Sequence, residues 1–368
     1  MSPPAILVPK LRGRALGLPF PGECGPWNAL TDVPGVEIGQ TTLIEGSSSR
    51  EAPVRTGVTV IRPHGHAENL MPLWAGFHAL NGNGEMTGMH WVKEGGYFVG
   101  AIGLTNTHSV GTVHQALLGQ LVRTHGRKLG AYQWALPVVG ETCDAYLSDM
   151  NGFHVREEHV VRAFQTAASG PVVEGNAGGG TGMVCYEFKG GNGTASRIVS
   201  HPAGRFTVGA FVQANMGLRA QLSVLGVPVG RFFDAELPSR REQGSIIVLI
   251  GTDAPLLPLQ LQRLARRGAV GIARTGSYAG DGSGDLCLAF STANSGASLS
   301  GEPRWKLDCV PDHLLDPFFL AAVEAVEEAI INALIAADSI DGVDGTSVRA
   351  IDHQQLVDIM RRHNRLSA

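Results

Sequence analysis

The residue best placed for chemistry in this chain is a serine that directly follows a glycine. Ser245 follows Gly244 and begins a strand-like segment whose next five residues, 246–250, are all aliphatic. If the peptide bond before Ser245 were cut, a hydroxyl and a free α-amine would share one residue. That amine, with a reference pKa of about 7.7–8.0, would serve as the base for its own hydroxyl. The alternative is an ordinary turn before a buried strand.

Two further groups of polar residues fall at the ends of predicted strands. Asn215 lies near the end of the apolar segment 206–217, where it is either a turn former or an amide donor aimed into a cleft. Ser283 and Asp285 lie in a glycine-rich segment that leads into another strand. At positions i and i+2 of an extended segment, their side chains share one face. They either act together there or only shape the turn.

The elements that must position these residues mix strands and helices along the chain. The helix over residues 256–267 is predicted to stop at Gly268, and that over 311–338 to break near Pro317. This mixture indicates a layered α/β fold, and without a clear linker we expect one domain over residues 1–368. The other predicted segments are strands at 33–43, 56–61, 97–104, 135–140, 206–217, 245–250 and 286–294, and helices at 111–125, 157–168 and 352–362.

Six short segments, in order along the chain, resemble the motifs of one known family. From about residue 25 to the C-terminus the chain resembles the self-processing aminopeptidases, which include the bacterial L-aminopeptidase/D-amidase-esterases and the β-peptidyl aminopeptidases. The segments are residues 82–85 (GNGE), 105–107 (TNT), 141–142 with Asp144, Gln213 with Asn215, 244–245 (GS) and 282–285 (GSGD).

This resemblance implies a four-layer α-β-β-α sandwich like that of the N-terminal nucleophile hydrolases, with a different connectivity that is shared with ornithine acetyltransferase. It implies a precursor that cuts itself between Gly244 and Ser245 into an α chain of residues 1–244 and a β chain of residues 245–368. It further implies a homotetramer that needs no metal or cofactor and releases N-terminal residues from short peptides, amino-acid amides and esters. L-, D- and β-amino acids all remain open as substrates.

The resemblance also implies roles for individual residues. Ser245 is the nucleophile in self-cleavage and again in turnover, and Asn215 stabilises the oxyanion. Ser283 and Asp285 order the hydroxyl and amine of Ser245; some relatives carry a longer glutamate at the position of Asp285. The alternative function is acyl transfer of the ornithine acetyltransferase type, although those enzymes use threonine at the position of Ser245.

An aminopeptidase must recognise a free amine, and Glu141 is the candidate for that contact, with Tyr146 lining the pocket. The alternative is that Glu141 caps a helix or pairs with an arginine. Cys143 has no basic neighbour in sequence and is expected to be structural.

The composition of the chain limits the kinds of partner and the cellular compartment that we expect for it. The net charge of −4, without a long basic tract, argues against a nucleic-acid partner. Five widely spaced cysteines with no CxxC pair, no signal-like N-terminus and no long apolar run predict a soluble, cytoplasmic protein without a membrane span. The thirteen histidines lack an HExxH spacing, so we expect no metal site. The glycine-rich segment 174–182 is expected to approach a substrate or a neighbouring subunit rather than a nucleotide.

Overall fold

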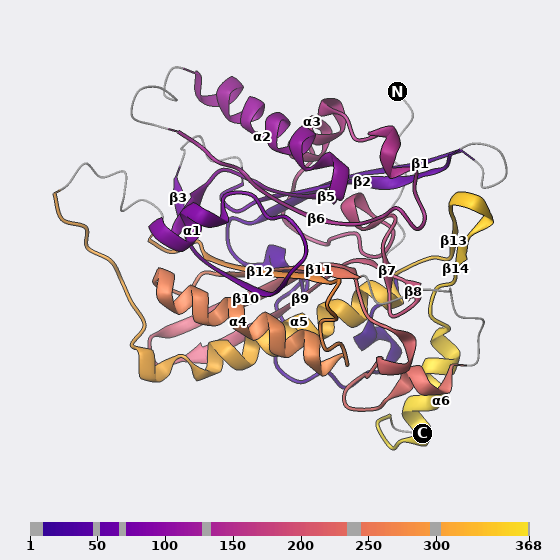
Figure 1. Cartoon of the computed structure of the whole chain (residues 1–368). Coiled ribbons are helices and arrows are strands. Elements are labelled where there is room, and N and C mark those ends of the chain that lie inside the picture. Colours follow the sequence, from indigo (N-terminus) through magenta and orange to yellow (C-terminus); the bar gives the residue numbers. More distant parts are fainter. Residues whose placement is uncertain are drawn as a thin grey trace.

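Two β-sheets lie face to face, and a pair of helices covers the outer face of each sheet (Figure 1). This computed structural model describes residues 10–46, 52–65, 71–126, 134–233, 244–294 and 303–366. The layer order is helices α2 and α3, a four-stranded sheet, a six-stranded sheet, and helices α4 and α5. The predicted α-β-β-α sandwich is confirmed. The polar sequence of residues 234–243 predicts an exposed loop, and these residues lie outside the described ones.

The four-stranded sheet has the order β1-β2-β5-β6. Strands β5 and β6 run parallel, joined by a connection that contains α2, and the other neighbours are antiparallel. Its elements are β1 (Glu37–Glu45), β2 (Val54–Arg62), β5 (Ile102–Asn106) and β6 (Val138–Thr142), covered by α2 (Val110–His125) and α3 (Glu157–Gln165).

The six-stranded sheet has the order β4-β3-β12-β11-β10-β9. Strands β11 and β12 run parallel through a crossover that contains α4, and the other neighbours are antiparallel. Its elements are β3 (Pro72–Gly82), β4 (Tyr97–Val99), β9 (Gly191–His201), β10 (Gly204–Asn215), β11 (Ser245–Thr252) and β12 (Gly284–Ser291), covered by α4 (Pro258–Arg274) and α5 (Asp316–Ile335).

Smaller elements complete the described chain. Helix α1 (Met89–Gly95) lies between β3 and β4, and α6 (His353–Arg362) follows an Asp352 cap. Two short hairpins pair β7 (Val184–Cys185) with β8 (Phe188–Lys189) and β13 (Ile340–Asp341) with β14 (Ser347–Val348).

Strand β11 begins at Ser245 and is buried along its whole length, as its apolar run predicted. Alternate side chains face opposite sides of the sheet. Ile246 and Val248 therefore pack toward α4 and α5, while Ile247 and Leu249 join the core between the two sheets. By the same alternation, the Ser245 side chain faces the space between the sheets.

The prediction of one strand over residues 97–104 is wrong. The chain turns at Gly100, whose φ of 103° lies in the region that favours glycine. Residues before the turn form β4 in one sheet, and residues after it form β5 in the other.

Two helix predictions also need correction. Gly268 does not end a helix: α4 continues to Arg274, and Gly268 lies buried at its interface with β12. A Cβ atom at Gly268 would lie 2.7 Å from Cys287 Sγ, so the missing side chain allows the close packing. Pro317 does not break α5 but occupies its first turn, where a missing N–H costs nothing.

The glycine-rich segment 174–182 closely approaches the protein's own strands. A Cβ atom at Gly179 would lie 2.2 Å from Gln213 Oε1, and one at Gly180 would lie 2.4 Å from the Asn192 backbone nitrogen. These glycines therefore let the segment pack between the edges of the two sheets.

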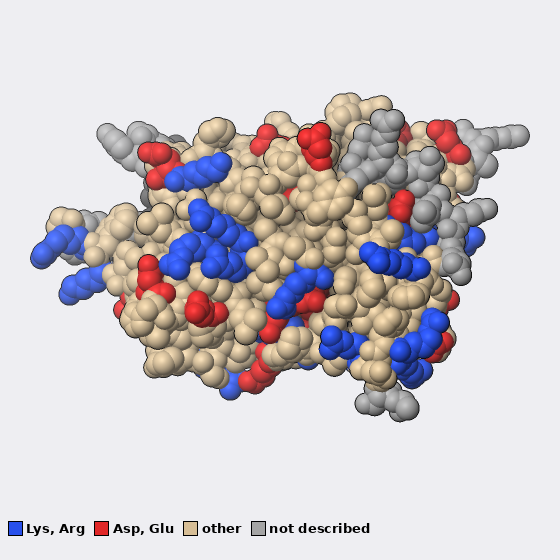
Figure 2. Space-filling view, turned by 60° about the horizontal axis from the view of Figure 1, so that its bottom comes forward, with Lys and Arg blue, Asp and Glu red and all other residues tan. Residues whose placement is uncertain are grey.

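Charged side chains are dispersed over the face that Figure 2 shows, where basic groups have acidic groups among them. Arg267 stacks on Phe319, 3.8 Å from the ring centroid, at the contact between α4 and α5. Among the described helices, none has the length and apolar character needed to cross a membrane.

Candidate active site

Ser245 and Asn215 lie side by side at the ends of two neighbouring inner strands of the six-stranded sheet. They are directly paired residues of antiparallel strands β11 and β10, and such pairs point to the same face. Both side chains are almost fully buried. The Gly284 N–H group donates to Ser245 Oγ at 3.2 Å. The candidate nucleophile therefore has an amide side chain on one side and a backbone donor on the other.

The amide of Asn215 is held at both of its ends. Its Oδ1 accepts from the Val184 N–H at 2.8 Å, and its Nδ2 donates to the Cys143 carbonyl oxygen at 3.0 Å. An amide nitrogen carries two protons. One is used by Cys143, so the second is available to another acceptor on the side of Ser245.

Ser283 and Asp285 form a hydrogen-bonded pair, with Ser283 Oγ 2.9 Å from Asp285 Oδ1. The parallel register places Gly284 opposite Ser245 and Asp285 opposite Ile246. Asp285 therefore lies on the side of the sheet that faces α4, next to Cys287. The buried pair approaches Ser245 from the face opposite to that of its hydroxyl group.

Gly244 occupies a position where a side chain does not fit. A Cβ atom there would lie 2.5 Å from the carbonyl oxygen of Asn215 and 2.5 Å from Met216 Cα. This close approach is a reason for glycine at this position.

Glu141 brings a carboxylate to the site from the four-stranded sheet, at the end of β6. It accepts hydrogen bonds from the Glu85 N–H at 3.0 Å and from the Thr107 hydroxyl. Among the described residues it has no arginine partner and caps no helix. A buried carboxylate with only neutral donors retains its attraction for a cation.

Gly84 connects Glu141 to the serine. A Cβ atom at Gly84 would lie 3.1 Å from Glu141 Oε1 and 3.5 Å from Gly284 Cα. Gly84 therefore lies between Glu141, on the four-stranded sheet, and Gly284, which pairs with Ser245 on the six-stranded sheet.

Tyr146 is half-buried and packs against a small cluster that includes Leu147, Val184 and Val348. Val184 is also the residue whose N–H binds Asn215. This contact places Tyr146 beside the residue that supports Asn215.

Two asparagines fix a loop next to the site, and one of them, Asn83, belongs to the motif of residues 82–85. Asn81 Nδ2 donates to the carbonyl oxygens of Gly280, Asp281 and Ser283, and Asn83 Nδ2 donates to that of Gly282. These bonds fix the loop before β12. The dense turn composition of residues 81–88 is visible in the sequence, but the partner loop is not.

Asp144 is a buried acid close behind the site. Asn106 Nδ2 donates to its carboxylate at 3.1 Å, and burial raises the pKa of Asp144 to about 6. Its neighbour Cys143 provides the carbonyl that binds Asn215. Desolvation inside the site, together with the nearby carboxylates of Asp144 and Glu141, raises the pKa of the Cys143 thiol even though the residue is exposed, so the structure gives no sign of an activated nucleophile there.

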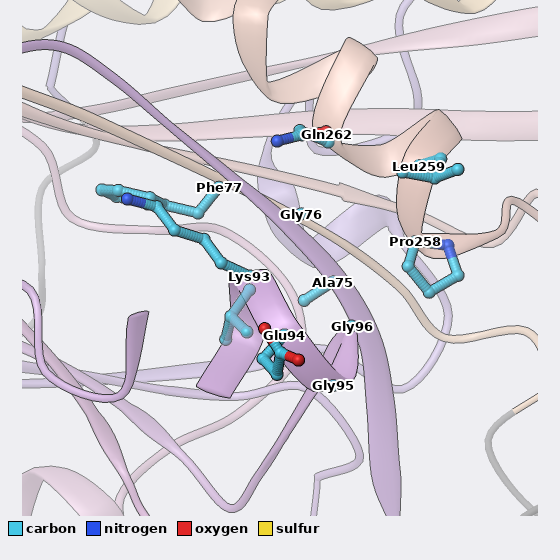
Figure 3. Close-up of a pocket in the computed structure, with 11 residues that line it drawn as sticks. Ala75, Gly76, Phe77, Lys93, Glu94, Gly95, Gly96, Pro258, Leu259 and Gln262 are labelled. Carbon is cyan, nitrogen blue, oxygen red and sulfur yellow. The ribbon is translucent and has the colours of Figure 1, made fainter. Parts of the chain in front are cut away.

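A separate surface hollow of about 250 Å³ lies where β3, α1 and α4 meet (Figure 3). Lys93 extends along Phe77, with Nζ 5.1 Å from the ring centroid, and Pro258 and Leu259 form the opposite wall. None of the predicted site residues lines this hollow. Within the described parts of the chain, no cluster of three or more His, Cys, Asp or Glu side chains has a metal-binding arrangement.

Together, the paired sheets with outer helices and the central strands that carry Ser245 and Asn215 form a fold like that of the N-terminal nucleophile hydrolases. Residues 28–348 match the family described as Peptidase family S58. The chain therefore belongs to peptidase family S58, and the resemblance predicted from its sequence motifs is confirmed.

Relatives of known name agree with this assignment. The chain is 47% identical to the beta-peptidyl aminopeptidase BapA of Sphingosinicella microcystinivorans, over 97% of this chain and 93% of that protein. The L-aminopeptidase D-Ala-esterase/amidase of Ochrobactrum anthropi superimposes with a TM-score of 0.92 at 48% identity, covering 97% and 99% of the two chains. The beta-aminopeptidase of a Burkholderia species gives a TM-score of 0.87 at 46% identity, covering 96% and 99%. These comparisons confirm a peptidase hydrolase and give no support to the acyltransferase alternative.

Proposed function

We propose that this peptidase is a self-processing serine aminopeptidase and amidase. It cuts its own chain between Gly244 and Ser245, and the new N-terminal serine then releases N-terminal residues from short peptides, amino-acid amides and esters. The acyl group passes through an ester on Ser245 Oγ. The two chains are residues 1–244 and 245–368.

The observation that carries this proposal is the meeting of three groups from three strands. The hydroxyl of Ser245 on β11 lies between Asn215 on β10 and Gly284 on β12, and the carboxylate of Glu141 on β6 lies beside Gly84, which in turn approaches Gly284. A nucleophile, a neutral donor for a developing oxyanion and a cation-binding carboxylate are the three parts that an aminopeptidase of this type requires.

In self-cleavage, Ser245 Oγ attacks the Gly244 carbonyl carbon. The C–N bond to Ser245 breaks, the serine nitrogen takes up the proton as a free amine, and an ester links Gly244 to Ser245 Oγ. Water then hydrolyses that ester and leaves a carboxylate on Gly244. Because no side chain fits at Gly244, the carbonyl stays open to attack.

In turnover, the free α-amine of Ser245 accepts the hydroxyl proton while Oγ attacks the substrate carbonyl. The second proton of Asn215 Nδ2 stabilises the oxyanion. The tetrahedral intermediate breaks its bond to the leaving amine or alcohol, which takes the proton, and water hydrolyses the acyl-enzyme. Ser283 and Asp285 hold the α-amine from the α4 side of the sheet, and Tyr146 lines the substrate pocket.

Glu141 binds the free ammonium group of the substrate. Because its described partners are neutral, Glu141→Gln removes the charge while keeping the shape. Loss of a hydrogen bond between charged groups typically costs about 1.5–3 kcal/mol, so kcat/KM for an aminoacyl p-nitroanilide should fall by about 10- to 100-fold. An unchanged kcat/KM would show that another group binds the amine.

Denaturing mass spectrometry of the purified protein tests the central proposal. We expect two fragments that meet at Gly244/Ser245, and a single uncut chain with no turnover in Ser245→Ala. An active preparation that contains only the intact 368-residue chain would exclude self-processing. A panel of L-, D- and β-aminoacyl p-nitroanilides then defines the acyl group.

Two further proposals concern the environment of the enzyme. We expect a homotetramer in solution, as the resemblance to the family implies, and light scattering after gel filtration measures its mass. We expect a cytoplasmic location from the number and wide spacing of the cysteines, and cell fractionation with an antibody tests it.

A further inference from the structure

A fully buried lysine lies directly behind the support of Asn215. Lys189 is at the end of β8, and its Nζ donates hydrogen bonds to three backbone carbonyl oxygens: those of Met183 at 2.8 Å, Gly190 at 2.8 Å and Gly180 at 3.3 Å. In the part of the chain that the structure describes, no carboxylate lies within ion-pair distance of Nζ. The charge of Lys189 is therefore directed at the peptide backbone.

The carbonyl group of Met183 and the N–H group of Val184 belong to the same peptide unit. The carbonyl oxygen accepts from Lys189 Nζ and from the Gly190 N–H at 2.9 Å. The N–H donates to Asn215 Oδ1 at 2.8 Å. One peptide unit thus connects the buried ammonium group to the amide of Asn215.

A positive charge at a peptide carbonyl strengthens the N–H at the other end, because hydrogen bonds in a chain polarise one another. A stronger bond to Asn215 Oδ1 draws electron density from the side-chain amide and makes its Nδ2 protons better donors. The same contacts fix the amide orientation, since Oδ1 stays on Val184 and Nδ2 faces Cys143 and the reaction site.

The hairpin that carries Lys189 is strained. Tyr186 and Glu187 at its turn have φ values of 50° and 59°, which are unfavourable for residues with side chains. The turn is held by Tyr186 Oη, which lies 2.7 Å from Thr275 Oγ1, and by Arg219 Nη2, which donates to the Glu187 carbonyl at 2.6 Å. Such strain costs about 1–3 kcal/mol per residue and persists only where surrounding contacts maintain it.

A purely structural role would be served more simply by an apolar residue. Replacing a buried charge by a well-packed apolar side chain of similar volume is often neutral or stabilising. Burial lowers the pKa of Lys189 to about 7, so the amine is charged only in part at neutral pH. The three carbonyl oxygens around Nζ match the three donors of an ammonium group, and this arrangement, in a strained hairpin beside Asn215, points to a task in the site.

We infer that Lys189 is a positioning residue for Asn215: its ammonium group fixes and polarises the Met183–Val184 peptide so that Asn215 presents a strengthened N–H to the oxyanion. This inference rests on the proposed role of Asn215. Lys189 touches neither substrate nor Ser245 in this arrangement, and its effect passes through the one peptide unit.

The first test compares Lys189→Met with the buried control Leu334→Ala on α5. In Lys189→Met we expect kcat for an aminoacyl p-nitroanilide to fall about tenfold, less than the roughly 10²–10³ typical of losing the donor itself, while KM stays within about twofold. Leu334→Ala should lower the melting temperature but leave kcat within about twofold. An unchanged kcat in folded, processed Lys189→Met would overturn the inference.

A double-mutant cycle with Asn215→Ala separates positioning from general damage. If Lys189 acts through Asn215, adding Lys189→Met to Asn215→Ala should change kcat by less than about twofold. The same fold loss in both backgrounds would show that Lys189 acts independently of Asn215 and would sink the inference.

Variants that do not cut themselves have no turnover to measure, so an NMR measurement provides the test for them. The side-chain amide protons of Asn215 are observed by NMR with 15N-labelled asparagine in two proteins. One carries Ser245→Ala alone, and the other carries Ser245→Ala together with the milder substitution Lys189→Gln. We expect an upfield shift of the Asn215 amide protons in Lys189→Gln, with Asn332 as an internal reference. No shift overturns the inference. Full activity of Ser245→Ala would instead refute the proposed function and leave the NMR result to stand by itself.

Discussion

The side chains of the candidate site are oriented mostly by backbone groups. Asn215 is held by the Val184 N–H and the Cys143 carbonyl, Ser245 by the Gly284 N–H, and Glu141 by the Glu85 N–H. Such contacts depend on how closely the strands approach one another. The glycines that allow this approach are therefore important for the geometry of the site.

Gly244→Ala tests this at the scissile bond. The added methyl group would lie 2.5 Å from the Asn215 carbonyl oxygen, so the chain must shift and the Gly244 carbonyl with it. Because a displacement of about 1 Å in a reacting group typically costs about 10² in rate, we expect processing to slow by about that factor. Gel electrophoresis of time points measures it. The control Gly111→Ala has open space at its Cβ and should process normally.

Asp144 gives a prediction for the dependence of stability on pH. Its pKa is about 6 in the folded protein and 3.8 ordinarily, so the folded state holds the proton more tightly. The resulting stabilisation is complete below the ordinary value and is lost as the pH rises through about 6. Asp144→Asn removes this dependence, so its stability relative to the parent should rise by about 2 kcal/mol between about pH 4.5 and about pH 7.5.

Urea unfolding at the two pH values measures this difference for Asp144→Asn. The exposed Asp358→Asn on α6 is the control and should show little change between them. A stability difference for Asp144→Asn that does not vary with pH would contradict the assignment.

Helix α4 sets the position of the strands that carry the site. Its Gly268 allows it to lie against Cys287 of β12 and Val248 of β11. The crossover through α4 is also what makes β11 and β12 parallel, so that Ser245 and Gly284 begin side by side. A change in the distance between α4 and the sheet would therefore shift the strands that hold Ser245 and Gly284 next to each other.

Gly268→Val should destabilise the protein by about 1–3 kcal/mol, because the side chain has no space against Cys287 Sγ. Thermal unfolding should show a lower melting temperature, with reduced processing of the chain. Gly119→Ala on α2, whose Cβ would meet only the side chain of Arg123 at ordinary contact distance, should be neutral or slightly stabilising. Equal melting temperatures for parent and Gly268→Val would show that α4 moves away without cost.

The two proposed chains share one sheet. Strand β11 of the 245–368 chain lies between β10 of the 1–244 chain and β12, and β12 in turn pairs with β3 of the first chain. The two strands of the 245–368 fragment are thus flanked on both sides by strands of the 1–244 fragment, and both fragments contribute to the core between the sheets and to the core under α4 and α5. Separation would require unfolding of the whole structure.

We therefore expect the fragments to elute together in native gel filtration and to unfold in one cooperative transition. They should separate only in denaturant. Elution of the processed fragments as two native species would contradict the interleaved arrangement. Ser245→Ala, which stays as one chain, provides the elution volume for comparison.

Part of this protein is determined by local sequence. Residues 246–250 form an uninterrupted apolar run after a glycine, and such a run predicts a buried strand with Ser245 at its head. Asn215, Ser283 and Asp285 were found because their motifs resemble those of a family. Helices α2, α3 and α6 follow from apolar periodicity within single segments, since periodicity is a property of neighbouring residues.

Other features were decided only by packing between layers. Strand β9 gave no signal because its Gly193 lies against α5, where a Cβ atom would meet the Ala329 carbonyl at 2.0 Å. Strand β3 has Gly76 against α4 for the same reason. Close helix–sheet contact requires small residues, and small residues weaken the apolar pattern that indicates a strand.

The same limit applies to the site. Nothing in the sequence near Glu141 shows that it lies beside Gly84, and nothing near Lys189 shows that it binds the peptide behind Asn215. These contacts join residues that are far apart in the chain, through backbone groups that every residue type possesses. Which backbone group meets which side chain depends on strand register and on the stacking of two sheets, so the tertiary structure alone determines it.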